Sequence, residues 1–379
     1  MLQSKLPNIG TTIFTVMSQM AHKYGAINLS QGFPDFEVSP ELIEGVGHHM
    51  KIGHNQYAPM PGLPQLREQI ANKLSLSYGH QIDEQSEVTV TGGATEALYS
   101  VITALVQSGD EVIVFEPAYD SYEPVIQLNQ GKVVRIKLQF PEFTIPWHEV
   151  NDLVSNKTKL IIINTPHNPT GSVLSSGDLD ELQKIVQKWG LYVLSDEVYE
   201  HIIFDQTEHQ SVLRYDGLKE HAVAVYSFGK TFHATGWKIG YAIAPSDITK
   251  EIRRVHQFLN FSVNTPMQWA LSDYLKDPDN YQSVAPFYQA KRDTFLSLIK
   301  ESRFKPIPCK GTYFQSLIFE DISTLGDVEM AEKMTSEHGV ASIPISVFYH
   351  DNRDDKVLRF CFAKKDETLE KAAEILCKI

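Results

Sequence analysis

Between residues 87 and 243, short apolar runs alternate with segments of helical pattern. The runs that we predict to be strands are 87–91, 111–115, 132–138, 160–163, 191–194, 222–226 and 239–243. Helices are expected from 92 to about 106 and from about 179 to 189. Apolar runs this short, bounded by turn residues, are typical of strands buried on both faces. Strands that alternate with helices predict right-handed crossovers, and therefore an α/β fold whose mostly parallel central sheet has helices on both faces.

Chemically rich residues follow five of these strands. In sheets of this kind, ligands bind outside the carboxyl ends of the strands. The residues in question are Thr91 to Thr95, Tyr119, Asn168, Asp196 with Tyr199, and Ser227 with Lys230. We therefore predict one functional site along that edge of the sheet.

Lys230 is the candidate reactive group. The strand 222–226 leads through Ser227 to Gly229, where we expect a sharp backbone turn that holds the lysine amine at the strand end. An amine in a partly desolvated cleft has a lowered pKa and can form a Schiff base. A nucleotide-binding P-loop is excluded, because that motif needs a glycine where Ala224 lies inside the strand.

The segment after the first of these strands favours a phosphate site. Gly92 and Gly93 open a helix, whose free N–H groups and dipole attract anions beside Thr95. Ser227 and Lys238 can add a hydroxyl group and a positive charge. A Gly-Gly-Ala-Thr turn taken alone is weak evidence, so this interpretation depends on the neighbouring loops.

The remaining residues of the edge fit a flat aromatic cofactor. Asp196 suits a protonated ring nitrogen, although a helix cap or a salt bridge is an alternative role. Asn168 and Tyr199 can hydrogen-bond a ring oxygen, and Tyr119 can stack on a ring. Together with Lys230 and the phosphate site, these features describe pyridoxal 5'-phosphate.

Over nearly its whole length the chain resembles the fold-type I, class I/II aminotransferases. The strings that carry this resemblance are Asn168-Pro-Thr-Gly171, Ser195-Asp-Glu-Val-Tyr199 and Ser227-Phe-Gly-Lys230. Within that family it is most similar to the bacterial methionine aminotransferases and the kynurenine aminotransferases. Four further segments match those groups in register: Gln31 to Asp35, Asn55 to Pro59, Thr231 to Lys238 and Phe261 to Pro266.

The resemblance implies roles for individual residues. Lys230 would form the Schiff base with the cofactor and move the substrate proton, with Asp196 and Tyr199 completing the catalytic group. The implied cofactor ligands are Gly93, Ala94, Thr95, Tyr119, Asn168, Asp196, Tyr199, Ser227, Lys230, Lys238, and Tyr57 from a second subunit. The implied substrate ligands are Gly32, Asn168 and Arg359. Lys238 departs from the arginine of many relatives, which replaces a bidentate phosphate contact with a point charge, and Tyr119 departs from their frequent tryptophan or phenylalanine.

The resemblance also implies the organisation and the activity. We expect an N-terminal segment (1–45) that joins the small domain, a large cofactor-binding domain (46–279) and a small α+β domain (280–379), in a homodimer. The expected reaction moves the amino group of a neutral or aromatic L-amino acid, of the methionine, phenylalanine, tyrosine, kynurenine or glutamine type, to a 2-oxo acid. Ile13, Phe14, Tyr57 and Phe348 would form an apolar side-chain pocket. A cysteine-S-conjugate β-lyase, which needs the same lysine and phosphate site, is the alternative.

Composition excludes several other classes of protein. The net charge of -13 argues against a nucleic-acid partner, and 379 residues leave no room for the DNA-binding module of a cofactor-binding regulator. No Gly-x-Gly-x-x-Gly turn supports a dehydrogenase. The three cysteines show no zinc-binding spacing, so we predict no metal and expect buried or inert thiols. The sequence has neither a signal-peptide pattern nor an apolar run long enough to span a membrane, so we predict a cytoplasmic protein.

Overall fold

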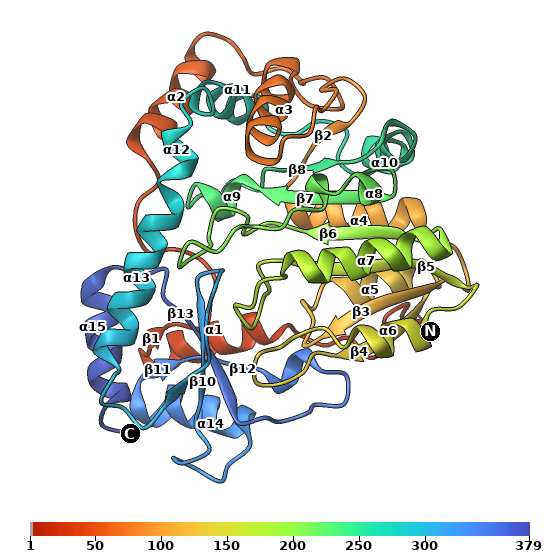
Figure 1. The fold of residues 1–379 in the computed structure, drawn as a ribbon. Helices are drawn as coiled ribbons and strands as arrows, with labels where there is room; N and C mark the ends of the chain where they lie inside the picture. Colours follow the sequence, from red (N-terminus) through yellow and green to blue (C-terminus); the bar gives the residue numbers. More distant parts are fainter. Residues whose placement is uncertain (1–2) are drawn as a thin grey trace.

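A seven-stranded sheet forms the centre of the computed structural model, which describes residues 3–379 (Figure 1). In spatial order its strands are β2 (Val88–Thr91), β8 (Gly240–Ile243), β7 (Ala222–Ser227), β6 (Tyr192–Asp196), β5 (Thr158–Asn164), β3 (Glu111–Glu116) and β4 (Lys132–Lys137). Only β8 runs antiparallel to its neighbours within this sheet. The segment between β7 and β8 contains single turns of helix and no helix long enough to cross the sheet. The expected α/β fold with a mostly parallel sheet is confirmed.

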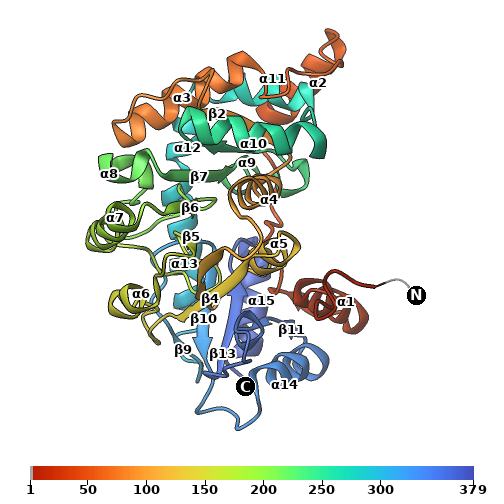
Figure 2. The same cartoon turned by 90° about the vertical axis from the view of Figure 1, so that its right-hand side faces the viewer.

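Helices cover both faces of this sheet. Figure 2 shows α4 (Ala94–Leu105), α5 (Tyr122–Leu128) and α10 (Ser246–Leu259) on one face, and α6 (Trp147–Leu153), α7 (Ser176–Trp189) and α8 (Asp216–Lys219) on the other. Alternate residues of β5 enter two different hydrophobic cores, with Ile161 in one and Ile162 in the other. This two-sided burial explains the continuous apolar run, since each buried side chain contributes about 1.5–3 kcal/mol.

Local capping fixes the bounds of α7 and α4. Helix α7 begins three residues earlier than expected, because Ser175 and Asp178 form a reciprocal capping box, and it ends at Gly190 in the left-handed conformation. Gly93, with φ +83°, is the N-cap of α4 and turns the chain from β2 into the helix. The positions of both helices agree with the alternation predicted from the sequence.

A second, antiparallel sheet of four strands lies below the first in Figure 1. Its order is β12 (Ile343–Pro344), β13 (Val357–Cys361), β10 (Phe314–Ile318) and β9 (Lys305–Pro306). The surrounding helices are α13 (Val284–Leu298), α14 (Asp327–Lys333), which continues as a π-helical turn to His338, and α15 (Asp366–Leu376). Two-residue strands such as β9 and β12 carry no readable periodicity, which is why they were not predicted.

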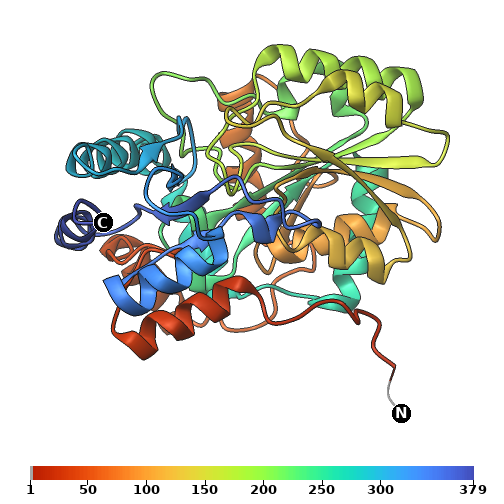
Figure 3. The same cartoon turned by 90° about the horizontal axis from the view of Figure 1, so that it is seen from below.

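The N-terminal segment packs against this second region. Strand β1 (Ile27–Asn28) pairs in parallel with β11 (Val340–Ala341), and α1 (Ile13–Tyr24) contacts the π-helical turn that follows α14 (Figure 3). The division into 1–45, 46–279 and 280–379 stays a prediction, and residues 1–2 lie outside the described part. Four further helices are α2 (Pro40–Lys51), α3 (Pro64–Tyr78), α11 (Thr265–Tyr274) and α12 (Asp279–Gln282).

The structure also bears on the predicted absence of a membrane span and on the three cysteines. Within residues 3–379, no helix combines the length and apolar character that crossing a membrane requires. The cytoplasmic location stays a prediction. Cys309 and Cys361 are buried as expected, whereas Cys377 is exposed near the C-terminus.

Candidate active site

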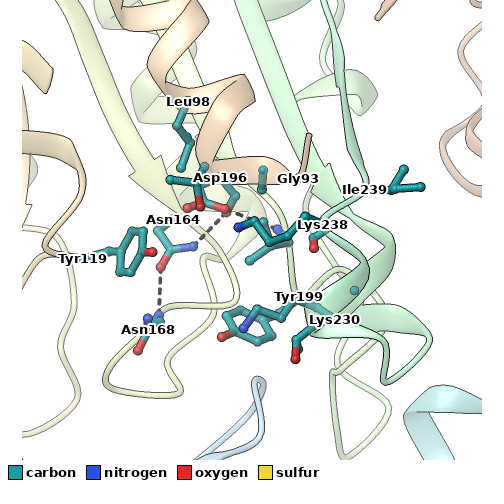
Figure 4. A pocket seen from close by; sticks show the side chains of 16 residues that line it. Gly93, Leu98, Tyr119, Asn164, Asn168, Asp196, Tyr199, Lys230, Lys238 and Ile239 are labelled. Carbon is teal, nitrogen blue, oxygen red and sulfur yellow. Dashed lines mark hydrogen bonds between the residues drawn. The ribbon is translucent and has the colours of Figure 1, made fainter. Parts of the chain in front are cut away.

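A cavity of about 210 Å³ lies at the carboxyl edge of the central sheet. All predicted site residues except Gly32, Tyr57 and Arg359 line it, namely Gly93, Ala94, Thr95, Tyr119, Asn168, Asp196, Tyr199, Ser227, Lys230 and Lys238. Figure 4 shows Tyr119 on one side of this space and the two lysines on the other. The strand ends therefore bring together residues that are far apart in the sequence.

Asp196 is a buried acid without a counter-ion. It is the last residue of β6 and 4% exposed, and its Oδ2 accepts a 2.6 Å hydrogen bond from the Tyr122 hydroxyl. Its Oδ1 accepts a longer bond, 3.4 Å, from the N–H of Val198. Burial raises its pKa from 3.8 to about 6, and no lysine, arginine or histidine of residues 3–379 forms an ion pair with it. A group in this situation favours the approach of a cation.

Asn164 and Tyr122 were not predicted, although both organise the site. The side chain of Asn164 donates to the Asp196 carbonyl at 2.8 Å and accepts from the Asn168 N–H at 2.8 Å, as the dashed lines of Figure 4 show. Asn164 ends β5 directly before the loop that contains Asn168. This position at a strand end could have identified it as a site residue from the sequence. Tyr122 is the first residue of α5, and nothing local distinguishes it from a core residue.

Lys230 lies in a single helical turn, α9 (Phe228–Thr231), and not at a bare strand end. Gly229 lies inside this helical turn and its φ is not positive, so the turn does not need the left-handed conformation of glycine. A Cβ at Gly229 would instead lie 3.1 Å from the backbone of Ala234 and Thr235, so the glycine permits close packing. Burial lowers the pKa of Lys230 from 10.5 to about 8.

The N-terminus of α4 and Lys238 form an anion cradle. The N–H of Gly92 is bound to the Glu96 carboxylate and that of Gly93 to a backbone carbonyl. The free N–H groups are therefore those of the first helical turn, at Ala94 and beyond. A Cβ at Gly93 would lie 3.4 Å from the Lys238 amine, so glycine keeps open the space between the amine and the helix.

Arg359 is a fully buried guanidinium with unfilled bonding capacity. It lies on β13, where Nη1 donates to Asn168 Oδ1 at 2.7 Å and Nη2 to the Ser30 carbonyl at 3.0 Å. Within the described residues its Nε has no partner, and no carboxylate lies within 4.0 Å of it. Burial lowers its pKa to about 10. Its guanidinium carbon is 3.8 Å from the ring centroid of Phe314, so aromatic faces surround a cation that lacks an anion.

Gly32 and Tyr57, which were also predicted to belong to the site, do not line the cavity. The carbonyl of Gly32 accepts from the Lys230 amine at 3.3 Å, and a Cβ at Gly32 would lie 2.6 Å from Phe314, so only glycine fits. Tyr57 lies outside the cavity of its own chain and is 82% exposed. Of the expected apolar pocket, Phe14 and Phe348 contact each other with centroids 5.9 Å apart. Tyr57 instead contacts Phe261, with centroids 5.5 Å apart.

The chain is similar to known aminotransferases over almost its whole length. The family described as aminotransferase class I and II matches residues 24–376. The chain is 54% identical to methionine aminotransferase of Escherichia coli over 99% of its own length and 97% of that protein. It is 35% identical to kynurenine–oxoglutarate transaminase of Dictyostelium discoideum, covering 98% and 95%. The crystal structure of YbdL from Escherichia coli, whose reactivity identified a methionine aminotransferase function, superposes over 100% of both chains with TM-score 0.98 and 53% identity.

Proposed function

The chain belongs to the class I and II aminotransferases, and from this premise we propose that it transfers the amino group of a neutral or aromatic L-amino acid to a 2-oxo acid, using pyridoxal 5'-phosphate. One observation carries the proposal: a buried acid, a half-buried lysine and an anion cradle surround one cavity, next to a guanidinium without an anion. The relatives, a methionine aminotransferase and a kynurenine–oxoglutarate transaminase, support the methionine type of donor and, second, the kynurenine type. The β-lyase alternative finds no support among them.

The residues present fit the proposed cofactor. Its phosphate group would be held by the first turn of α4, at Ala94 and Thr95, with Ser227 and Lys238. The open space beside Gly93 and the positive charge of Lys238 support this assignment. When bound, pyridoxal phosphate supplies a sink for the electrons of the substrate Cα–H bond.

The rest of the cavity would orient the ring of the cofactor. Asp196 would hold a proton on the ring nitrogen, because an ionised carboxylate that is buried without a counter-ion stabilises a cation. Asn168 and Tyr199 would donate to the ring oxygen, and Tyr119 would cover one face. Because the Asn164 side chain ties the Asp196 backbone to that of Asn168, the two ring contacts are held in a fixed relation.

Lys230 and Arg359 would act on the substrate. With its pKa near 8, part of the Lys230 population is neutral at physiological pH and can carry a proton at Nζ. Arg359 would bind the substrate carboxylate, a charge-assisted contact worth about 1.5–3 kcal/mol. Its existing bond to Asn168, which lines the cavity, fixes the guanidinium next to that cavity.

The surroundings of the cavity support a neutral or aromatic side chain. A second cavity of about 590 Å³ shares Tyr119 with the first and is lined also by Ile13 and Phe348. The carboxylate of Asp120 lies in its wall, so an acidic substrate side chain would meet a like charge. We therefore expect dicarboxylic donors such as aspartate to be poor substrates.

A homodimer is part of the proposal. Tyr57 and Phe258 are 82% and 86% exposed, and the Tyr57 ring contacts Phe261 at 5.5 Å between centroids. Large aromatic side chains gathered on a surface support contact with another protein. The proposed partner is a second copy of the chain, in which each Tyr57 hydroxyl reaches the phosphate site of the other subunit.

A substrate panel tests the proposed specificity. Purified protein with pyridoxal 5'-phosphate would be given methionine, phenylalanine, tyrosine, kynurenine, glutamine or aspartate, each with several 2-oxo acids, and the products measured by mass spectrometry. We expect kcat/KM for methionine or an aromatic donor to exceed that for aspartate at least ~10-fold. A preference for aspartate would refute the pocket argument, and pyruvate and ammonia released from a cysteine conjugate without an acceptor would indicate a lyase. Lys230→Ala should abolish transamination.

A further inference from the structure

Tyr313 contacts the amine of Lys230 directly. This tyrosine precedes β10 and is fully buried, and its hydroxyl accepts a hydrogen bond from Lys230 Nζ at 2.9 Å. The same hydroxyl donates to the carbonyl of Gly32 at 2.6 Å. Because Lys230 Nζ is also 3.3 Å from that carbonyl, the three groups form a closed triangle.

The direction of these bonds determines the orientation of the amine. A phenol has one proton, and the proton of Tyr313 is committed to Gly32, so the phenol oxygen is an acceptor toward Lys230. Both neighbours of Nζ are therefore acceptors. A neutral amine that points its two N–H groups at these two oxygens must direct its lone pair away from both, and Lys230 also lines the cavity.

We propose that Tyr313 is a positioning residue for proton transfer, whose hydroxyl fixes the rotation of the Lys230 amine so that the nitrogen lone pair faces the substrate cavity. The proposal rests on the proposed role of Lys230 as the proton carrier and adds a residue to that role. A lysine must be an unsubstituted amine while it carries a proton, and the triangle describes the contacts of such an amine. Without the Tyr313 hydroxyl, the amine would keep one acceptor and could rotate about its Cε–Nζ bond.

Several parts of the structure hold the Tyr313 ring in place. Thr312 is fully buried with φ +67°, and its N–H donates to the Ile202 carbonyl at 2.9 Å. The Tyr313 carbonyl accepts from the N–H of Phe362 at 3.0 Å. The ring itself packs edge-on against Tyr199, with centroids 5.2 Å apart and planes at 85°. The hydroxyl therefore has little freedom to follow a moving amine, which is the property that a positioning group needs.

Tyr288 offers a matched control. It is also fully buried, its ring centroid is 5.7 Å from that of Tyr313, and its hydroxyl bonds to His233 Nδ1 at 2.8 Å. Tyr313→Phe and Tyr288→Phe each remove one buried phenol hydroxyl from the same aromatic cluster. Only the first removes a contact to Lys230.

The first measurement does not depend on activity. Cofactor-free full-length protein would be labelled with a trace of acetic anhydride across a pH series, and the labelling of Lys230 followed by mass spectrometry. The Tyr313 hydroxyl stabilises the ammonium form of Lys230 by accepting its hydrogen bond. We therefore expect the midpoint of Lys230 labelling to fall by about one pH unit in Tyr313→Phe, which removes this acceptor, and to stay unchanged in Tyr288→Phe. An unchanged midpoint in Tyr313→Phe would overturn the proposal.

The second measurement uses the enzyme with its cofactor and a donor deuterated at Cα. We expect kcat of Tyr313→Phe to fall about 10- to 100-fold with little change in KM, and the deuterium isotope effect on kcat to rise as proton transfer becomes slower. A purely structural role would lower thermal stability and cofactor affinity and leave the isotope effect unchanged, which would also overturn the proposal.

Two further cases are distinguished, one in which Tyr313→Phe does not fold and one in which the wild-type protein is inactive. If Tyr313→Phe does not fold, 3-fluorotyrosine placed at position 313 alone keeps the ring and weakens the oxygen as an acceptor. The Lys230 midpoint should then fall by less than in a full deletion, and no fall would refute the proposal. If wild-type protein shows no transamination at all, the proposed function fails, while the labelling series still decides whether Tyr313 controls the Lys230 amine.

Discussion

Asp196→Asn should make the cofactor-free protein more stable while removing its function. The wild-type side chain is a buried carboxyl whose pKa is raised from 3.8 to about 6, mainly by burial. One pKa unit corresponds to 1.36 kcal/mol, so the shift of about two units means that ionised Asp196 costs about 3 kcal/mol of stability at pH 8. Asparagine carries no charge, and its carbonyl can still accept the bond from Tyr122.

The stability that Asp196 contributes should decrease as the pH rises. Because the folded pKa lies above the unfolded one, the neutral carboxyl favours the folded state below about pH 4, and this contribution is lost as the pH rises through about 6. The amide of the variant adds an N–H group without an acceptor, and this cost reduces the gain in stability by about 1 kcal/mol. We therefore expect Asp196→Asn to be more stable than wild type by about 2 kcal/mol at pH 8, and this gain to shrink by about 1 kcal/mol at pH 5.

Urea unfolding of the cofactor-free proteins, followed by tryptophan fluorescence at one protein concentration and at both pH values, measures this difference. Asp205→Asn is a control of opposite sign, since Arg292 holds the pKa of the Asp205 carboxyl below its usual value through two hydrogen bonds. That variant should lose stability at pH 8. Two results would refute the conclusion that ionised Asp196 destabilises the folded protein. The first is a variant that is less stable than wild type at pH 8, and the second is a stability difference that is the same at both pH values.

Three further predictions concern binding. Arg359→Lys should lower kcat/KM about 10- to 100-fold through loss of about 1.5–3 kcal/mol of carboxylate binding, measured by steady-state kinetics, whereas an unchanged KM would count against its role. Gly93→Ala should lose about 1–3 kcal/mol of stability, because its φ of +83° and ψ of 168° lie in a region that essentially only glycine adopts, and it should bind pyridoxal phosphate more weakly as the new methyl group approaches Lys238, measured by urea unfolding and cofactor titration. Tyr57→Phe should raise the cofactor Kd about tenfold with the dimer intact in sedimentation, and an unchanged Kd would contradict a shared phosphate site.

Much of the fold and of the cavity could be predicted because both depend on local sequence. A strand such as β5 must be apolar at every position, since Ile161 and Ile162 enter different cores. Because parallel strands end at the same edge of a sheet, residues at their ends or a few positions beyond, such as Asp196 and Lys230, had to lie close together. The family resemblance then added Arg359, whose position relative to the cavity no local pattern could give.

The sequence by itself determined the α/β class, the edge of the sheet that carries the chemistry and most of the side chains that line it. Only the tertiary structure decided which groups control them: Tyr313 reaches Lys230 across 83 residues, Arg359 reaches Asn168 across 191, and Tyr122 holds Asp196 from the first residue of a helix. Hydrophobic periodicity and turn motifs report the local conformation of the backbone and which side chains are buried. Hydrogen bonds between distant segments exist only after those segments have packed together, so their partners cannot be read from either segment alone.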